Sequence, residues 1–294
     1  MIYNILRQTS SYRIKDLQGE IRKALSIFRN PAYALISPYA VVLDCEGLAK
    51  PRVQQLASAH GSVEEQFLAA ASELLQLADD LGAHGRCVNI VVSDFWARPL
   101  VIPFPGRVPT DADVEAVLTS SYRRIYADMM QGWSWSWALQ EARLVSVAWP
   151  SDGLTELRNG INNRAGLLRT AKPMAVEITG SVLRQPESVW FAIIEHFNLT
   201  LLRLNKGAWD GYLVVNSQAD IAKTLVLQLT RETARLQDSC KKVSILDFCC
   251  TANLSAATRT LKEQGWSVHN CSSKEAGSSR AYRLMQSVAW RGVQ

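Results

Sequence analysis

The chain has 294 residues, of which 48% are hydrophobic and 20% are charged, with only six cysteines. This composition excludes disordered, collagen-like and disulfide-scaffold proteins. No apolar run reaches the ~18 residues of a membrane span, and the N-terminal stretch MIYNILRQTSSYRIK lacks the apolar core of a secretion signal. We therefore expect an ordered, soluble and cytoplasmic protein.

The net charge of +5 is concentrated at one end of the chain. Residues 239–294 hold eight basic and three acidic side chains, so residues 1–238 sum to zero. A basic end can bind nucleic acid or a membrane surface, but apolar residues separate these charges and favour a solvated face. The cysteines form no CxxC pair, which indicates free thiols in a reducing compartment and no metal site.

Apolar periodicity predicts the elements of the first half. Ser62 and Glu65 form a capping box at the start of one helix, and Trp133, Trp135 and Trp137 alternate with serine, which predicts a strand whose tryptophans fill the core. The predicted order is a helix at 16–29, a strand region at 33–44 with a turn at Ser37-Pro38, a helix at 62–81, strands at 87–92 and 97–104, a helix at 110–130, a hairpin at 133–149 and a helix at 152–169.

The second half is predicted as a meander followed by crossover units. Its order is an extended segment at 174–183, strands at 189–196, 199–205 and 211–215, a helix at 218–237, a strand at 242–248, a helix at 254–263 and a strand at 266–270. This order is typical of a mixed α/β sheet, and residues 33–92 repeat it more weakly. The predicted boundaries are a helical arm at 1–30, a first lobe with inserted strands and helices at 31–173, a second lobe at 174–273 and a basic tail at 274–294.

Few motifs carry chemistry. The strand and turn at 242–253 superficially match the first motif of a methyltransferase, but Cys249 and Cys250 stand where that motif needs glycine. The sequence contains no phosphate-loop, nucleophile-elbow or zinc-protease motif. Asp44 and Glu195 are predicted at strand ends and could approach one another, but two acids make a weak metal site. We predict neither catalytic residues nor metal ligands.

Two stretches resemble a known pattern. One is VVSDFWARPLVIPF, followed by a helix with Tyr122 and Tyr126 and by GWSWSWALQ; the other is WFAIIEHFNLTLLRLNKGAWDGYLVV, followed by Thr230-Arg231-Glu232. Over roughly residues 33–270 the chain resembles the actin-like cytoplasmic components of type IV pilus and type II secretion assembly platforms, which include PilM-like proteins and the cytoplasmic domain of the L-type secretion protein. The resemblance implies an α/β, actin-like fold of two ribonuclease-H-like lobes, with mixed sheets flanked by helices.

The resemblance also implies a nucleotide site from which this sequence departs. Relatives that bind ATP use a glycine-bearing acidic turn in each half and a Gly-Gly turn near the end. The matching turns are interpreted here as Asp44-Cys45-Glu46-Gly47, Glu195-His196-Phe197-Asn198 and the turn beginning Cys249-Cys250. Because β-carbons at such turns keep backbone N–H groups away from phosphate, we expect a vestigial site and no bound cofactor.

The expected function is a non-enzymatic scaffold of a pilus or secretion assembly platform. It would bind a membrane-anchored platform protein or the assembly ATPase, and would reach the inner membrane only through such partners. The predicted partner-binding residues are Arg280, Arg283, Trp290 and Arg291 in the basic tail. Two alternatives stay open, an ATP/Mg-binding actin-like protein with atypical phosphate turns and, less favoured, a basic nucleic-acid-binding module.

Overall fold

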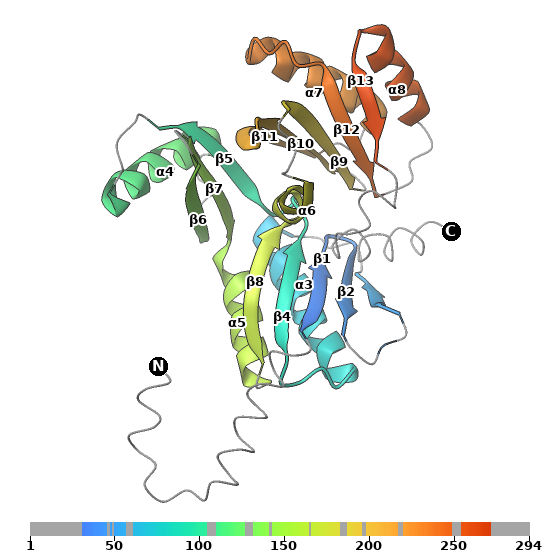
Figure 1. Cartoon of the computed structure of the whole chain (residues 1–294). Coiled ribbons are helices and arrows are strands. Elements are labelled where there is room, and N and C mark those ends of the chain that lie inside the picture. Colours follow the sequence, from blue (N-terminus) through green and yellow to red (C-terminus); the bar gives the residue numbers. More distant parts are fainter. Residues whose placement is uncertain are drawn as a thin grey trace, which may run out of the picture.

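The computed structural model arranges the chain as two lobes with a smaller third sheet at the side, and α6 (Met174–Val182) lies between the lobes (Figure 1). It describes residues 31–45, 48, 50–56, 61–104, 110–126, 132–140, 143–164, 166–182, 187–195, 198–216, 220–248 and 254–271. The predicted helical arm, the tail residues Arg280, Arg283, Trp290 and Arg291, and the turn residues Gly47, Cys249 and Cys250 lie outside the described residues.

The first lobe is built on a mixed sheet of order β3-β2-β1-β4-β8. Its strands are β1 (Ala32–Ile36), β2 (Ala40–Asp44), β3 (Arg52–Gln55), β4 (Cys87–Val92) and β8 (Leu167–Pro173). The first three strands pair antiparallel, whereas β4 and β8 run parallel to β1. The carboxyl ends of β1, β4 and β8 therefore share one edge of the sheet, where α/β proteins usually place their sites.

Two helices, α3 (Val63–Asp80) and α5 (Ser151–Asn163), pack together on one face of this sheet. The predicted capping box of α3 is confirmed, since Ser62 and Glu65 exchange side-chain and backbone hydrogen bonds. The helices approach closely because α5 presents glycines. A β-carbon at Gly153 would lie 2.3 Å from a ring carbon of the buried Phe67.

The second lobe repeats this topology. Its sheet has the order β11-β10-β9-β12-β13, with three antiparallel strands followed by two parallel ones. The strands are β9 (Val189–Glu195), β10 (Asn198–Asn205), β11 (Ala208–Asn216), β12 (Lys242–Asp247) and β13 (Ser267–Asn270), and the helices that cover them are α7 (Ile221–Arg235) and α8 (Leu254–Glu263). The predicted order of strands and helices in this half is confirmed from β9 onward.

The third sheet is inserted between β4 and α5 and has the order β5-β7-β6. Its elements are β5 (Arg98–Pro103), α4 (Asp111–Tyr126), β6 (Trp133–Gln140) and β7 (Arg143–Pro150). Helix α4 covers one face, where Trp133 is buried and Trp135 stacks on Tyr122 at 5.5 Å between ring centroids. Trp137 is 40% exposed and is not covered by α4. The prediction that the tryptophans fill the core therefore holds only for the first part of the strand.

Two predicted elements are wrong. Residues 174–182, expected to be extended, form the buried helix α6, which packs in one apolar cluster with Leu35 and Val91 of the first lobe and Phe191 of the second. The helix predicted at 152–169 ends at Asn163, and its last residues belong to β8. In the part of the chain that the structure describes, no helix is both long and apolar enough to cross a bilayer.

Candidate functional site

The turns at the carboxyl ends of β1 and β9 are where the resemblance predicts a nucleotide. The register pairs Tyr33 with Asp44 and Ile36 with Val41, so the turn after β1 is Ser37-Pro38-Tyr39. Asp44 is the last residue of β2 and therefore lies at the opposite end of the strands, where the chain leads toward β3. The predicted turn at Ser37-Pro38 is thus confirmed, and the predicted phosphate-turn residue Asp44 lies at the end of β2, at the opposite end of this hairpin from the β1–β2 turn.

The true β1–β2 turn is closed on itself. The backbone N–H of Ser37 donates to the carbonyl of Ala40 at 3.0 Å, and the Ser37 hydroxyl bonds both the carbonyl and the N–H of Ala40. Pro38 has no N–H to offer, and Tyr39 carries a large side chain. The Ser37 and Ala40 N–H groups are thus used within the turn, whereas glycine-rich turns hold phosphate with free, closely approachable backbone donors.

Glu195 and Asn198, the two predicted positions of the second turn that the structure describes, are both buried at the end of β9 and the start of β10. Their side chains touch, since the Asn198 amide nitrogen lies 3.4 Å from Glu195 Oε2. The same carboxylate oxygen accepts a short hydrogen bond from the Ser93 hydroxyl, just after β4. Glu195 is thus bonded across the boundary between the lobes.

Asp94, which follows Ser93, is fully buried and makes a second set of contacts across this boundary. Tyr212 of β11 donates its hydroxyl proton to Asp94 Oδ1 at 2.7 Å, and the Ala175 amide at the start of α6 lies 3.2 and 3.3 Å from the two carboxylate oxygens. The sequence analysis missed Ser93, Asp94 and Tyr212 as site residues. The polar Ser-Asp pair directly after the apolar strand 87–92 was the signal that could have found them.

Burial perturbs both acids. Desolvation raises the pKa of Asp94 to about 6, although hydrogen bonds from Tyr212, the Ala175 amide and Thr200 act in the opposite direction. Desolvation and the neighbouring Asp94 charge raise the pKa of Glu195 to about 8. At neutral pH the pair therefore retains a proton, and the stronger upward shift favours Glu195 as its site.

A groove lies where the third sheet meets the first lobe. It has a volume of about 590 Å³ and is lined by β6, the end of β7, α5 and β8. Among the described strands, β6 pairs only with β7 and β8 only with β4, so both strands are sheet edges with unpaired backbone groups. Two exposed arginines, Arg158 of α5 and Arg169 of β8, line it together with Leu154, Leu168 and the buried Trp149.

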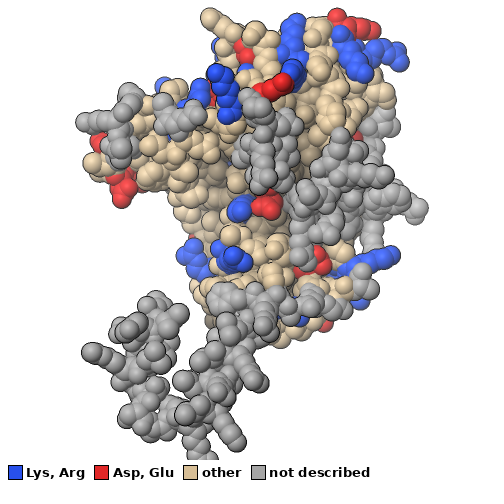
Figure 2. Space-filling view, in the orientation of Figure 1, with Lys and Arg blue, Asp and Glu red and all other residues tan. Residues whose placement is uncertain are grey.

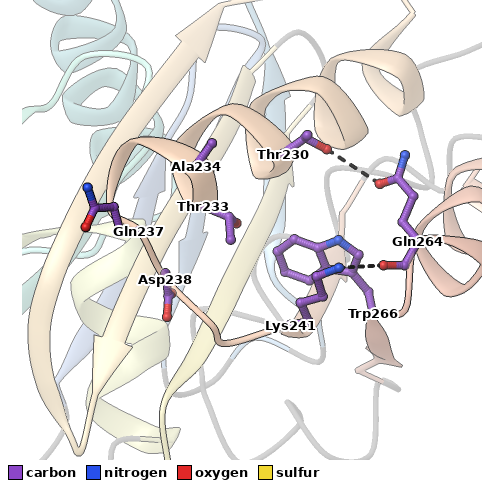
Figure 3. Close-up of a pocket in the computed structure, with 8 residues that line it drawn as sticks. All are labelled: Thr230, Thr233, Ala234, Gln237, Asp238, Lys241, Gln264 and Trp266. Carbon is purple, nitrogen blue, oxygen red and sulfur yellow. Dashed lines mark hydrogen bonds between the residues drawn. The ribbon is translucent and has the colours of Figure 1, made fainter.

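A second cavity, also of about 590 Å³, lies at the far end of the second lobe near the end of α7 (Figure 3). Its two charged side chains, Lys241 and Asp238, already have partners within the lobe. The Lys241 ammonium donates to the Gln264 carbonyl at 2.8 Å, and Asp238 is paired with the buried Arg203. Neither charged side chain of the lining is therefore free.

The charged side chains of the described residues form no continuous basic patch on the face visible in Figure 2. There Lys and Arg form small separate groups, several of them next to acidic residues, with uncharged surface between them. In the described part of the chain no group of three or more His, Cys, Asp or Glu side chains is arranged to hold a metal ion.

Comparison with known proteins identifies the fold. No protein-family model and no curated protein matches the sequence. Among solved structures, a Bacteroides thetaiotaomicron protein of unknown function with an actin-like ATPase fold is 8% identical over 91% of this chain and 98% of its own, with a TM-score of 0.62. The PilM-PilN type IV pilus biogenesis complex gives a chain 14% identical over 90% of this chain and 98% of its own, with a TM-score of 0.58.

A third match is the cytoplasmic domain of EpsL, an inner membrane component of the Vibrio cholerae type II secretion system, with 11% identity over 74% of this chain and 82% of its own. Its TM-score is 0.48, too low to establish a shared fold. The first two matches, together with the repeated sheet order of the two lobes, confirm the predicted actin-like fold of two ribonuclease-H-like lobes.

Proposed function

We propose that this chain is a non-enzymatic scaffold of a membrane assembly platform, and that it binds an extended segment of a membrane-anchored partner in the groove between β6 and β8. The observation that carries the proposal is the meeting of two unpaired strand edges in one groove. An extended segment can add to such an edge through main-chain hydrogen bonds.

The lining residues suggest the chemistry of the segment. Trp149, Leu154 and Leu168 supply apolar surface for side chains of the partner. Arg158 and Arg169 have no ion-pair partner among the described residues, and the described lining of the groove contains no carboxylate. A segment with apolar residues and at least one acidic side chain therefore fits the groove best.

The structural matches support a role in assembly. One of them comes from a complex of PilM with PilN that acts in type IV pilus biogenesis, and this chain shares its fold over nine-tenths of its length. By analogy, the chain would reach the inner membrane through its partner and belong to a pilus or secretion platform.

The proposed absence of a nucleotide cofactor rests on the boundary between the lobes. The β1–β2 turn has Pro38 and Tyr39 where a phosphate cradle needs bare backbone, and the buried Asp94 and Glu195 lie at the same strand ends. Without bound ATP there is no phosphoryl group to transfer, so the scaffold would have no ATPase activity.

Site-specific photocrosslinking in the native cell tests this proposal. A photoreactive amino acid at Thr170 of β8, inside the groove, is expected to capture a protein with a transmembrane span, and peptide mapping should place the crosslink in its cytoplasmic segment. The matched control carries the same amino acid at the exposed Arg259 of α8. Crosslinks to the same protein from both positions, or none to a membrane protein from Thr170, would contradict the proposal.

A further inference from the structure

We infer that Asp94 and Glu195 form a proton-dependent latch between the two lobes, which is closed while Glu195 holds a proton and loosens when the proton leaves. This device is independent of what occupies the groove between β6 and β8. It concerns how the two halves of the fold are held together where related architectures place a ligand.

The first support is that both Asp94 and Glu195 accept a side-chain hydrogen bond from the opposite lobe. Ser93 and Asp94 follow β4 in the first lobe, and the Ser93 amide donates to the Ile36 carbonyl at 2.8 Å, which fixes them at the end of β1. Glu195 and Tyr212 belong to the second lobe. The Ser93–Glu195 and Tyr212–Asp94 hydrogen bonds are therefore two direct links between the lobes.

The second support is a pair of buried oxygens without donors. Glu195 Oε1 and Asn198 Oδ1 have no hydrogen-bond partner among the described residues, although both side chains are more than nine-tenths buried. Leaving buried acceptors unsatisfied is costly. A proton on the Glu195 carboxyl supplies one donor to this cluster and removes one of the two buried charges.

The third support is the charge of the surroundings. The groups that act electrostatically on Glu195 are Asp94 and hydrogen-bond donors, and no cation of the described residues offsets the pair. Tyr212 is the other titratable group in contact, and burial raises its pKa further above the ordinary range. Of the elements packed nearby, β12 ends in Asp247, and β8 and α6 contribute the ion pair of Lys172 with Glu177 at 3.4 Å. Loss of the proton would therefore place two uncompensated negative charges between the lobes.

The expected response is local. Apolar side chains of both sheets and of α6 form one cluster beneath the latch, with Leu35, Met174 and Phe191 among its members. This cluster does not titrate, so the lobes stay associated when the latch opens. The α6 amide of Ala175, which donates to Asp94, is the most direct reporter of the change.

Amide hydrogen exchange of the full chain, corrected for the intrinsic pH dependence of exchange, tests the inference. Between pH 6 and pH 9, peptides that cover the first turn of α6 and the end of β9 should exchange at least ~10-fold faster, whereas α3 in the first-lobe core should not change. Glu195→Gln keeps the side chain neutral and adds a donor, so it should abolish most of this dependence. Glu232→Gln, at a buried glutamate of α7 away from the latch, should keep the wild-type profile.

Tyr212→Phe covers the case in which Glu195→Gln does not fold. It removes the donor to Asp94 and leaves both carboxyls, so exchange at α6 should be faster at every pH while the transition persists. A pH-independent wild type, an unchanged transition in Glu195→Gln, or no effect of Tyr212→Phe would overturn the latch. Closure that depends on added Mg²⁺ at constant pH would overturn it as well, since the cluster would then hold a cation instead of a proton.

Discussion

Tyr212 of the second lobe donates a 2.7 Å hydrogen bond to the carboxylate of Asp94, which is fully buried at the end of β4 in the first lobe. This bond joins the two halves of an actin-like fold at the strand ends where α/β proteins usually bind ligands. Ser93 and Glu195 form the neighbouring link. The lobes are thus joined directly by side chains.

The free energy of unfolding should fall as pH rises from 6 to 8. The pKa of Glu195 is raised to about 8 in the folded chain, so the folded state binds a proton that the unfolded state has already lost. An acid whose pKa is higher in the folded state than in the unfolded state stabilises the fold fully below its unfolded-state pKa. This stabilisation is lost as the pH rises through its folded-state pKa. The slope approaches about 1.4 kcal/mol per pH unit for one such group.

Urea unfolding at several pH values measures this dependence. Asp94, with a pKa raised to about 6, adds to the slope only below that pH. In Glu195→Gln the curve between pH 6 and 8 should be nearly flat. A wild-type chain that becomes more stable over this range would show that the acids are ionised and compensated in the fold.

Millimolar Mg-ATP should leave the melting temperature unchanged, because a ligand that does not bind the native state cannot shift unfolding. The closed Ser37-Pro38-Tyr39 turn is the structural reason. A thermal shift of several degrees that Glu195→Gln abolishes would instead favour the ATP-binding alternative. Mg²⁺ without nucleotide is the control.

Reversing the charge of the groove should weaken partner binding without unfolding the protein. Replacing both Arg158 and Arg169 by glutamate is expected to raise the Kd for the crosslinked segment, as a synthetic peptide, by at least ~10-fold, or about 1.4 kcal/mol. Both side chains are exposed, so the melting temperature should change little. Arg259→Glu on α8 is the matched control, and equal loss of binding in this variant would argue against the groove.

Gly153→Ala should destabilise the first lobe by about 1–3 kcal/mol, since the new methyl group would lie 2.3 Å from the rigid ring of Phe67. Alanine favours helices by up to about 1 kcal/mol over glycine, which offsets only part of this cost. Asn159→Ala, at an exposed position of the same helix, should be neutral or stabilising. Chemical denaturation of the two variants compares them, and equal stabilities would mean that α3 and α5 are not in close contact.

The sequence correctly predicted those strands and helices that are marked by patterns of neighbouring residues. Strand 87–92 and the start of α3 came out at the right residues, because a bounded apolar run and a capping box depend only on neighbouring residues. Residues 174–183 were predicted as extended, and Val176, Ile178 and Thr179 do favour strands locally. Packing between the two lobes overrides that preference, and no local pattern reports such packing.

The candidate site was harder to predict for the same reason. Ser93 and Glu195 are 102 residues apart, and their contact depends on how the two lobes meet. The groove likewise requires the inserted sheet to lie beside β8, a strand whose first residues, 167–169, the sequence pattern had placed in a helix. Glu195 and Asp44 were both predicted at strand ends and do end β9 and β2, but only Glu195 takes part in the contacts between the lobes.

The most direct test of the account is amide hydrogen exchange of the whole chain with two ligands in turn, the synthetic peptide of the crosslinked segment and Mg-ATP. The account predicts that the peptide protects amides of β6 or β8 and that Mg-ATP protects none. Protection of the Ser37–Tyr39 turn and the end of β9 by Mg-ATP, with β6 and β8 unchanged by the peptide, would contradict it.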